Sequence, residues 1–527
     1  MSRVYYRKTL VDLLKELHYS LQMKKLLLLI CASAAALLAQ APTVLSVINS
    51  ESPTQNTLLC PGLLASIYGT GFGSGAVSSV VVLVGGKNAY VIAVTPTQVN
   101  VQLPFDAPVG ATTVVVTTGA GTSAPLNITL AAVAPTLPVA PKTTIGIISN
   151  VKSSFLSSTT LANPGDTLTL YATGLGATNP VVPAGLAPSS TVVQTVVPVT
   201  LTVGGVAATV SFAGLTPSQT GLYQINFAVP ANVQGNASVI LSIGGQTSNT
   251  VTLPLYGISA LTSGASFLNT GTAAPEEIIS IFANGLGATN ELANVFPATG
   301  AQGVSVTFNG IAAPIFALAA TGSQINLIVP AELPTTGTVQ VQLTTPAGKS
   351  PNFPLVMETA VPGMFLTNDP SNAKAQIAAM QFANTVWLVV PTSTATALQI
   401  PQNCTASSAN PLSICGQPAA PGDYLVLYMT GLGEATPKGD PKGTPLATGV
   451  VAPVDGSTLY ETIATPTVQI GGVAATPLFS GIAPGTAGEY QVDFQVPTGV
   501  PEGDAVPITV SMPGSNTATA TLAVHTR

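Results

Sequence analysis

The sequence has very few of the side chains that carry enzymatic or metal chemistry. Its 527 residues include two histidines and one tryptophan, and charged residues make up 6% of the chain, against a usual share of about 25%. A Ser-His-Asp triad would need the near-terminal His525 as its base, because the other histidine lies in the first 41 residues. The chain contains no H-E-x-x-H, Cys-x-x-Cys or G-x-S-x-G pattern. We therefore predict no catalytic residues, no metal site and no cofactor, and a protein that is not an enzyme.

Positive charge is also scarce, and this argues against a nucleic-acid partner. Residues 1–41 hold six of the 14 basic and two of the 20 acidic residues, so the rest of the chain carries a net charge of −10. Such a surface is not attracted to phosphate backbones. Hydrophobic residues reach 46%, which is too many for a disordered chain. The 50 glycines and 44 prolines indicate frequent turns.

Residues 23–41 (MKKLLLLICASAAALLAQA) have the pattern of a secretory leader. Two lysines precede an apolar stretch, and the final Ala-Gln-Ala fits the small-x-small cleavage rule. The stretch is shorter than the roughly 20 residues that span a membrane, and no later run is long enough, so we predict no membrane span in the mature chain. We expect a signal-peptide helix within residues 1–41 and a secreted or cell-surface protein; an uncleaved anchor is the alternative. Met23 is the predicted natural start, which makes residues 1–22 an upstream extension or a long positive region.

Two of the cysteines are predicted to form a disulfide. Cys404 and Cys415 bracket the short polar loop CTASSANPLSIC, and an oxidising compartment favours their pairing. Closing so short a loop stabilises a fold by about 3 kcal/mol in the chain-entropy treatment. Metal binding is disfavoured because no histidine or further cysteine lies nearby in the sequence. Cys60 is left over, and we expect it to be a buried free thiol.

Three motifs recur four times in the same order, which is the strongest signal in the sequence. The first motif, as in PGDTLTLYATGLG, places a G-x-G ten residues after a proline. The second, as in VGGVAATVSF, has a Gly-Gly or Asn-Gly pair between apolar runs. The third, as in YQINFAVP, has six residues from glutamine to proline. The G-x-G glycines are Gly71 and Gly73, Gly174 and Gly176, Gly285 and Gly287, and Gly431 and Gly433.

These motifs predict β-strands. Tyr223, Ile225 and Phe227 alternate with more polar or smaller residues, and a period of two is typical of a strand with one buried face. The Gly-Gly and Asn-Gly pairs are typical of hairpin turns, and short strands with regular turns indicate antiparallel sandwiches. We predict an all-β fold, a tandem array of four Ig-like antiparallel β-sandwich domains after the leader (1–41). The predicted domains are module 1 (42–138), module 2 (139–256), module 3 (257–358) and module 4 (359–527), the last with an N-terminal extension and the Cys404–Cys415 loop.

The repeated motifs resemble those of the Solibacter-type C-terminal family of secreted soil-bacterial proteins, and the modules resemble Ig-like TIG/IPT domains. In residues 361–527 the segments VPGMF, APGD, YMTGLG, IGGVAA and YQVDFQVP follow one another in the family order. Residues 139–256 match nearly as well, and 42–138 and 257–360 match in shorter form. The resemblance implies an Ig-like fold and an exported protein, and it brings no catalytic residues. The departures from the pattern are Pro275-Glu276 in place of Pro-Gly, and Asp493 in place of asparagine.

The recurrent glycines and the few acids are assigned structural roles. We interpret each G-x-G as a bend or bulge, not a phosphate loop, because the third glycine and the following helix are missing. Asp166 and Asp423 each follow Pro-Gly, and we expect their side chains to close a turn by bonding backbone amides; a cation site is the alternative. Glu276-Glu277 is the one adjacent acid pair. Because strand neighbours point to opposite faces, we expect a solvated turn there and not the paired carboxylates of a glycosidase.

A polar stripe along the third motif is the candidate binding surface. Amides two residues apart on a strand share one face and are suited to hydrogen-bonding sugar hydroxyls or a neighbouring module. The alternative is that they bond their own loops or face water. The stripe consists of Gln98 and Asn100, Gln224 and Asn226, Gln324 and Asn326, and Gln491 and Asp493.

Together these features favour an exported, non-enzymatic protein for adhesion, surface scaffolding or spacing. Its expected partner is a protein or a cell-surface glycan, and no nucleic acid. A carbohydrate-binding protein is the first alternative, although exposed aromatic platforms are hard to build from one tryptophan and twelve tyrosines. A carboxylate-dependent hydrolase is the second alternative, and it would require converging acids.

Overall fold

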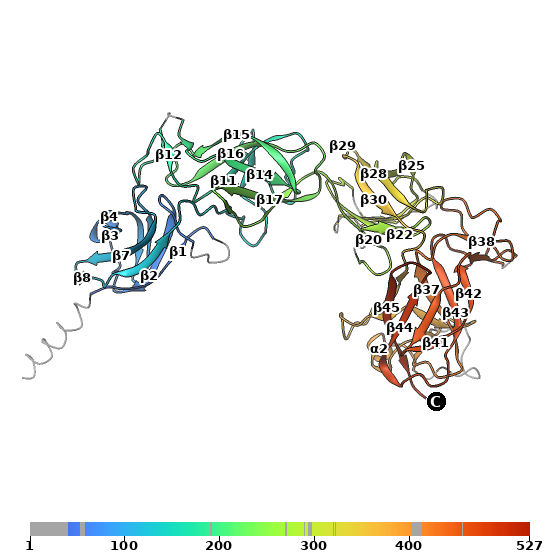
Figure 1. The fold of residues 1–527 in the computed structure, drawn as a ribbon. Helices are drawn as coiled ribbons and strands as arrows, with labels where there is room; N and C mark the ends of the chain where they lie inside the picture. Colours follow the sequence, from blue (N-terminus) through green and yellow to red (C-terminus); the bar gives the residue numbers. More distant parts are fainter. Residues whose placement is uncertain are drawn as a thin grey trace, which may run out of the picture. The chain divides into compact units, whose positions relative to one another are not determined.

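A computed structural model describes residues 41–527, except 53–57, 190–191, 269–270, 289, 293–297, 320, 322, 403, 405–413 and 456. The predicted signal-peptide helix lies outside the described residues. Within the described part the regular secondary structure is almost wholly β-strand (Figure 1). The described residues also include a short α-helix, α2 (Thr392–Ala397), and a 3-10 turn, η1 (Val77–Ser79). No helix among these residues is long and apolar enough to cross a membrane.

The chain divides into two compact units. The first unit holds the residues up to Leu156, Gly165–Pro230 and Ser238–Leu253. The second holds Ser157–Pro164, Ala231–Ala237 and Pro254–Arg527. Most of modules 1 and 2 therefore lies in the first unit, and modules 3 and 4 lie almost wholly in the second.

Module 1 is a sandwich of two sheets. The first sheet has the order β1 (Thr43–Asn49), β2 (Leu64–Thr70), β6 (Gln98–Gln102) and β5 (Tyr90–Thr95). The second has the order β4 (Lys87–Asn88), β3 (Val81–Val84), β7 (Gly110–Thr118) and β8 (Gly121–Thr122), and β9 (Leu126–Leu130) also pairs with β7. Because alternate residues of a strand share a face, the valines at alternate positions of β3, β6 and β7 meet in one buried core.

Module 2 forms one continuous sheet. Its main path is β10 (Ile148–Asn150), β11 (Thr167–Ala172), β16 (Tyr223–Ala228), β15 (Val206–Leu215), β14 (Val199–Val203), β17 (Asn236–Ile243) and β18 (Gln246–Thr247). The side branches are β12 (Thr178–Asn179), β13 (Gln194–Thr195) and β19 (Val251–Pro254). The long strand β15 explains the continuity, because its first residues pair with β14 and its later residues with β16. A register shift between Val210 and Phe212 marks a bulge, where a strand bends.

Module 3 again has two sheets. The first has the order β20 (Gly257–Ser263), β22 (Ile278–Asn284), β27 (Gln324–Ile328), β26 (Ile315–Ala319) and β23 (Glu291–Leu292). The second has the order β21 (Thr272–Ala273), β30 (Phe353–Met357), β28 (Gly337–Thr345), β24 (Ser305–Phe308) and β25 (Ile311–Ala312), with β29 (Gly348–Lys349) beside β28. The buried alternate residues of both sheets form one core.

Module 4 has the largest sheets because the residues before its first motif add strands. The first sheet has the order β36 (Gly416–Gln417), β35 (Leu388–Val389), β34 (Met380–Phe382), β37 (Tyr424–Thr430), β43 (Tyr490–Gln495), β42 (Pro477–Ile482), β39 (Tyr460–Thr462) and β38 (Ala435–Pro437), and β31 (Gly363–Met364) pairs with β37. The second has the order β32 (Leu366–Thr367), β33 (Ile377–Ala378), β45 (Thr517–Val524), β44 (Gly503–Ser511), β40 (Thr467–Ile470) and β41 (Val473–Ala475). The predicted Cys404–Cys415 disulfide is confirmed, and it lies in the same core as Trp387.

In every module the first and third motifs form adjacent antiparallel strands. The pairs are β2 with β6, β11 with β16, β22 with β27, and β37 with β43. In β16, Tyr223, Ile225 and Phe227 are buried, and the residues between them are half-buried. The polar stripe of the third motif is therefore on the face of the sheet that points away from the core.

Candidate functional site

The polar stripe of module 1 is bonded within itself. The amide nitrogen of Gln98 donates to Asn100 Oδ1 at 2.7 Å and to Ser66 Oγ at 3.2 Å. Ser66 lies opposite Asn100 on the neighbouring strand β2, and its hydroxyl donates to the same Asn100 oxygen at 3.0 Å. These three side chains thus form a closed hydrogen-bonded triangle.

The stripes of modules 2 and 3 follow the same plan. In module 3, Gln324 donates to Asn326 at 2.6 Å and to Ser280 at 3.1 Å, and Ser280 donates to Asn326 at 2.8 Å. In module 2, the Thr169 hydroxyl donates to Asn226 Oδ1 at 3.0 Å, and Gln224 is half-buried beside it on β16. A serine or threonine hydroxyl opposite the asparagine is therefore shared by the first three modules.

Module 4 departs from this plan at two positions. Val426 lies opposite residue 493, where the other modules have a hydroxyl, and residue 493 is an aspartate. The Gln491 amide lies 3.2 Å from both carboxylate oxygens of Asp493. Burial raises the pKa of Asp493 to about 6, and the Gln491 hydrogen bond opposes that rise. The carboxylate has about four acceptor positions, so hydrogen-bonding capacity remains on this face.

A hollow of about 570 Å³ lies on this outward face of module 4. Its lining combines aromatic with polar side chains. The Tyr428 hydroxyl donates to Gln381 Oε1 at 3.0 Å, and Tyr424 is 54% exposed. We call this surface the module 4 face. Its main side chains are Gln381, Tyr424, Tyr428, Phe479, Gln491 and Asp493.

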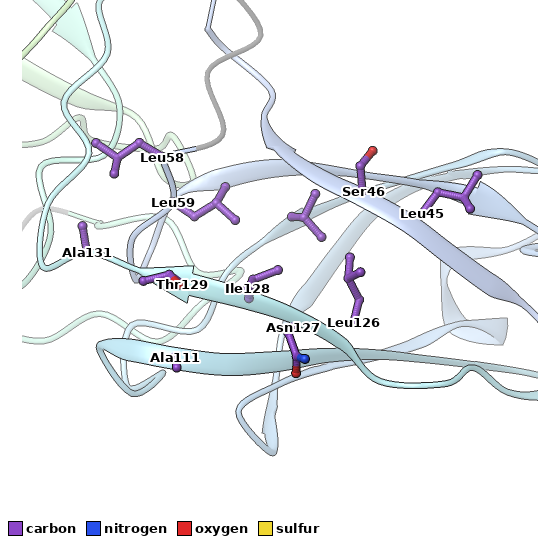
Figure 2. Close-up of a pocket in the computed structure, with 11 residues that line it drawn as sticks. Leu45, Ser46, Leu58, Leu59, Ala111, Leu126, Asn127, Ile128, Thr129 and Ala131 are labelled. Atoms are coloured by element: carbon purple, nitrogen blue, oxygen red, sulfur yellow. The ribbon is translucent and has the colours of Figure 1, made fainter.

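A second cavity, of about 940 Å³, lies at the side of module 1 (Figure 2). It opens between β1, at the edge of one sheet, and β9, which pairs with β7 of the other. Figure 2 shows the apolar side chains of Leu59, Leu126 and Ile128 around this space, and Asn127 on the same strand as the last two. The described residues that line this cavity are mainly apolar, and none of them is titratable.

Within each unit the two neighbouring modules meet at the G-x-G turn of the later module, which is module 2 in the first unit and module 4 in the second. In the second unit, Thr430 Oγ1 accepts a hydrogen bond from Ile278 N of module 3 at 2.7 Å and donates to Gly488 O at 2.9 Å. The Tyr490 hydroxyl donates to Gly433 O at 2.7 Å, and Val361 N donates to Gly431 O at 2.8 Å. We call this contact region joint 3–4.

The first unit has a corresponding arrangement, which we call joint 1–2. It differs at Thr173, which has the position of Thr430 in the motif but whose buried hydroxyl has no hydrogen-bond partner among the described residues. The Tyr223 hydroxyl donates to Gly176 O at 2.5 Å, and Ala134 N donates to Gly174 O at 2.8 Å. The Cys60 thiol of module 1 reaches the same Gly174 oxygen at 3.5 Å. Burial raises the pKa of Cys60 to about 12, so this free, buried cysteine stays a neutral thiol.

The G-x-G glycines have the backbone that these joints require. All eight described glycines have positive φ, between 62° and 86°, which favours glycine. A Cβ on Gly174 would lie 2.0 Å from Ala134 O, and one on Gly431 would lie 2.1 Å from Val361 O. The chain that links the two modules therefore passes directly against the turn in both joints.

The expectation that Glu276-Glu277 form a solvated turn is wrong. Glu276 is 6% and Glu277 1% exposed, because the turn that carries them is covered by module 4 in joint 3–4. Burial raises the pKa of Glu276 to about 7, opposed by a hydrogen bond from Tyr490, and the charges of Glu434 and Glu332 raise it further. Burial also raises the pKa of Glu277 to about 8, although its carboxylate accepts a hydrogen bond from Ala274 N at 2.9 Å.

The tyrosines of the joints were missed by the sequence reasoning, which treated them only as core residues. The signal is present in the third motif, because modules 2 and 4 begin it with Tyr223 and Tyr490, whereas modules 1 and 3 have Thr97 and Ser323. Each unit therefore pairs a module without the tyrosine with a following module that has it.

The remaining predicted residues have the following places. Asp423 Oδ2 accepts a hydrogen bond from Ala420 N at 2.7 Å, which closes the Pro-Gly turn, and it is also bonded by the Arg527 guanidinium. Val229 N donates to the backbone oxygen of Asp166 at 2.9 Å in the equivalent turn. Across the described part of the chain, no three His, Cys, Asp or Glu side chains gather as metal ligands would.

Comparison with known protein families finds a match to one domain family, within module 1. Residues 46–131 match the IPT/TIG domain, which confirms the TIG/IPT-type fold predicted there. Together with the sheet topology, the match shows an IPT/TIG domain within a chain of multiple Ig-like β-sandwich domains. The resemblance to the Solibacter-type family stays a prediction. No curated protein matches the chain.

Several solved structures are distantly similar to the chain. The full extracellular region of plexin A4 is 10% identical, with 90% of this chain and 30% of that chain covered and a TM-score of 0.23. The glucan-locus protein SGBP-B of Bacteroides ovatus is 14% identical (62% and 74% covered, TM-score 0.17). The Escherichia coli adhesin FdeC is 13% identical (60% and 96% covered, TM-score 0.16). The chain spans only 30% of the plexin region and 25% of a γ-CGTase from Alkalophilic bacillus clarkii, which is 14% identical with 41% of this chain covered and a TM-score of 0.15.

Proposed function

We propose that the chain is an exported, non-enzymatic protein whose Ig-like modules serve adhesion, surface scaffolding or spacing. The observation that carries the proposal is the presence of two corresponding joints, one in each compact unit, which share the tyrosine-to-glycine and the backbone-to-glycine hydrogen bonds. Adjacent domains move relative to one another unless their interface fixes them. Joints 1–2 and 3–4 bury polar bonds between modules, and a protein that spaces a surface from a partner needs such fixed pairs.

Export is supported by the leader pattern of residues 23–41 and by the disulfide. A disulfide persists in an oxidising compartment outside the cytosol, and Cys404 and Cys415 are bonded. The proposal of a secreted or cell-surface protein rests on these two features. The proposal that it is not an enzyme rests on the scarcity of acid–base groups and on the burial of the one adjacent acid pair within a joint.

Small-angle X-ray scattering of the mature chain (42–527) tests the spacing role. Thr430→Val removes both hydrogen bonds of the joint hydroxyl at almost constant volume, and Thr467→Val on an exposed strand position is the matched control. We expect Thr467→Val to give the same distribution of dimensions as the native chain, and Thr430→Val to give a broader one. A Thr430→Val distribution equal to the native one would contradict the proposal, and so would turnover of a substrate by the purified protein.

Carbohydrate binding is the second candidate function, and the module 4 face is the observation that favours it. A binding surface for sugars needs aromatic side chains beside fixed hydrogen-bonding groups, and the module 4 face supplies both. Binding of the mature chain to a glycan array tests this role, and adhesion to whole cells tests the leading one.

A further inference from the structure

We infer that the module 4 face binds a neutral carbohydrate chain and that Asp493 is its central hydrogen-bond acceptor. The inference rests on the second proposed function and assigns it to one surface of the chain. It concerns a site in which four strands contribute side chains to one hollow.

The polar and aromatic groups of this face lie in register. Gln381 pairs with Val426, Val426 with Asp493, and Asp493 with Phe479, so these residues form one row across β34, β37, β43 and β42. In this row the amide of Gln381 and the carboxylate of Asp493 are separated by the apolar Val426, and the phenyl ring of Phe479 follows Asp493. Side chains in such a row are held by the sheet and lose little freedom on binding.

Two tyrosines flank this row on β37. Tyr424 and Tyr428 lie two residues on either side of Val426, so all three side chains point outward. Four residues of strand cover roughly 13 Å, which is long enough for more than one sugar ring. An aromatic ring offers the apolar C–H face of a sugar a flat surface, and the hydroxyl of a tyrosine adds a polar end. Tyr428 is oriented by its hydrogen bond to Gln381.

The charge of the lining selects the class of ligand. None of the described residues that line the hollow is basic, and the nearby guanidinium of Arg527, over the Phe382 ring, is already paired with Asp423. A sulfated, phosphorylated or uronic-acid polymer would therefore meet a carboxylate without a free counter-charge in the lining. One carboxylate is also too few for calcium, which takes six to eight oxygen ligands. Adjacent sugar hydroxyls are donors that a carboxylate accepts strongly, since hydrogen bonds to a charged acceptor are about twice as strong as neutral ones.

The other three modules lack this combination. At the positions equivalent to Tyr424 they have Leu64, Thr167 and Ile278, and their asparagines are occupied by a serine or threonine hydroxyl. Val426 removes that competing hydroxyl in module 4, which leaves the Asp493 oxygens with Gln491 as their side-chain donor among the described residues. Module 4 therefore differs from its repeats at the positions where a ligand would be bound.

Affinity electrophoresis and titration calorimetry of the mature chain test the inference. The probes are soluble neutral polysaccharides (a glucan, a mannan, a xylan and a galactan), with polygalacturonate as an anionic control. Asp493→Asn restores the asparagine of the other modules, and Tyr424→Ala removes an exposed ring, so both variants retain the fold. Tyr68→Ala removes a partly exposed ring of module 1 and is the matched control.

We expect at least one neutral polymer to bind, with affinity at least tenfold weaker in Asp493→Asn and in Tyr424→Ala and unchanged in Tyr68→Ala. Thermal unfolding of each variant checks that the fold is retained. Binding that survives both module 4 variants would overturn the site and leave carbohydrate binding as a function of the chain. Binding of polygalacturonate alone, or of no polymer, would overturn the inference. The spacing role is tested separately, by the scattering experiment.

Discussion

The hydroxyl of Tyr490 lies 3.4 Å from a carboxyl oxygen of Glu276, which stands 214 positions earlier and belongs to the preceding module. The same hydroxyl donates to Gly433 O at 2.7 Å. Both side chains are buried, so an acid of module 3 is enclosed by the turn of module 4. Burial disfavours the charged form of a carboxyl group. The packing of these two modules is therefore coupled to the protonation of Glu276 and of its neighbour Glu277.

The stability of the second unit is predicted to fall as the pH rises from about 4.5 to about 8. The ordinary pKa of both acids is 4.5, and it rises to about 7 for Glu276 and about 8 for Glu277 in the folded chain. In this range the folded chain keeps protons that the unfolded chain has lost, so stability is full below pH 4.5 and lost toward pH 8. Glu276 alone accounts for about 3 kcal/mol. Urea unfolding followed by Trp387 fluorescence at several pH values measures the slope.

The variants Glu276→Gln and Glu277→Gln separate this effect from general acid sensitivity. Each glutamine keeps the size of the side chain and stays neutral, so we expect the unfolding free energy to vary less with pH and to be higher than native at pH 8. Glu502→Gln, at an exposed position of module 4, is the control and should follow the native slope. Equal slopes for all three variants would show that the joint acids do not titrate with folding.

Tyr490→Phe is predicted to destabilise the second unit by about 1–2 kcal/mol. The change removes the hydroxyl that bonds Gly433 O and leaves that carbonyl buried without this donor. Tyr223→Phe should have a similar cost in the first unit, because Tyr223 bonds Gly176 in the same way. Tyr90→Phe, at a 48% exposed position, should change the unfolding free energy by less than about 0.5 kcal/mol. Clearly unequal losses of unfolding free energy in Tyr490→Phe and Tyr223→Phe would show that the two tyrosines do not stabilise their joints in the same way.

The sequence predicts the strands and the sheets well because their signal is local. Alternation in Tyr223, Ile225 and Phe227 gives the buried face of β16 directly, and a glycine pair between apolar runs indicates a hairpin. The Cys404–Cys415 disulfide is predictable for the same reason, since the loop that it closes is short. In each case the interacting residues are close in the sequence, and few alternatives compete.

The burial of Glu276 and Glu277 could not be predicted in this way. An acid pair after proline is ordinarily solvated, and this pair is covered in part by residues of module 4 such as Tyr490, which lies 214 positions after Glu276. The free hydrogen-bonding capacity of Asp493 also depends on a residue distant in the sequence. Val426, which lies opposite on the neighbouring strand, has no hydroxyl group to donate to it. Long-range contacts between single residues produce no periodic pattern in the sequence. The one sequence feature that indicated the joints is the tyrosine that begins the third motif in modules 2 and 4 only.

Loss of the disulfide is predicted to destabilise module 4 by about 3 kcal/mol in the chain-entropy treatment. The double variant Cys404→Ser, Cys415→Ser removes the bond, and Trp387 in the same core reports the unfolding of this module by its fluorescence. Cys60→Ala is the control, because Cys60 lies in the other unit and should leave the tryptophan transition unchanged. A double variant with the native midpoint would show that the loop contributes nothing to the stability of module 4.

Gly431→Ala is predicted to disrupt joint 3–4, whereas Gly472→Ala is predicted to be tolerated. Both glycines have positive φ, 72° and 84°, so both alanines carry the cost of a left-handed backbone, about 1–2 kcal/mol. A Cβ on Gly431 would also lie 2.1 Å from Val361 O, while a Cβ on Gly472 has no heavy atom within 4 Å. The alanine at 431 must therefore push away the chain that links modules 3 and 4, and we expect a cost of at least about 3 kcal/mol together with faster proteolysis at that link. If the two variants lost the same stability and were cleaved at the same rate, the close approach of Gly431 and Val361 would not be what holds the modules together.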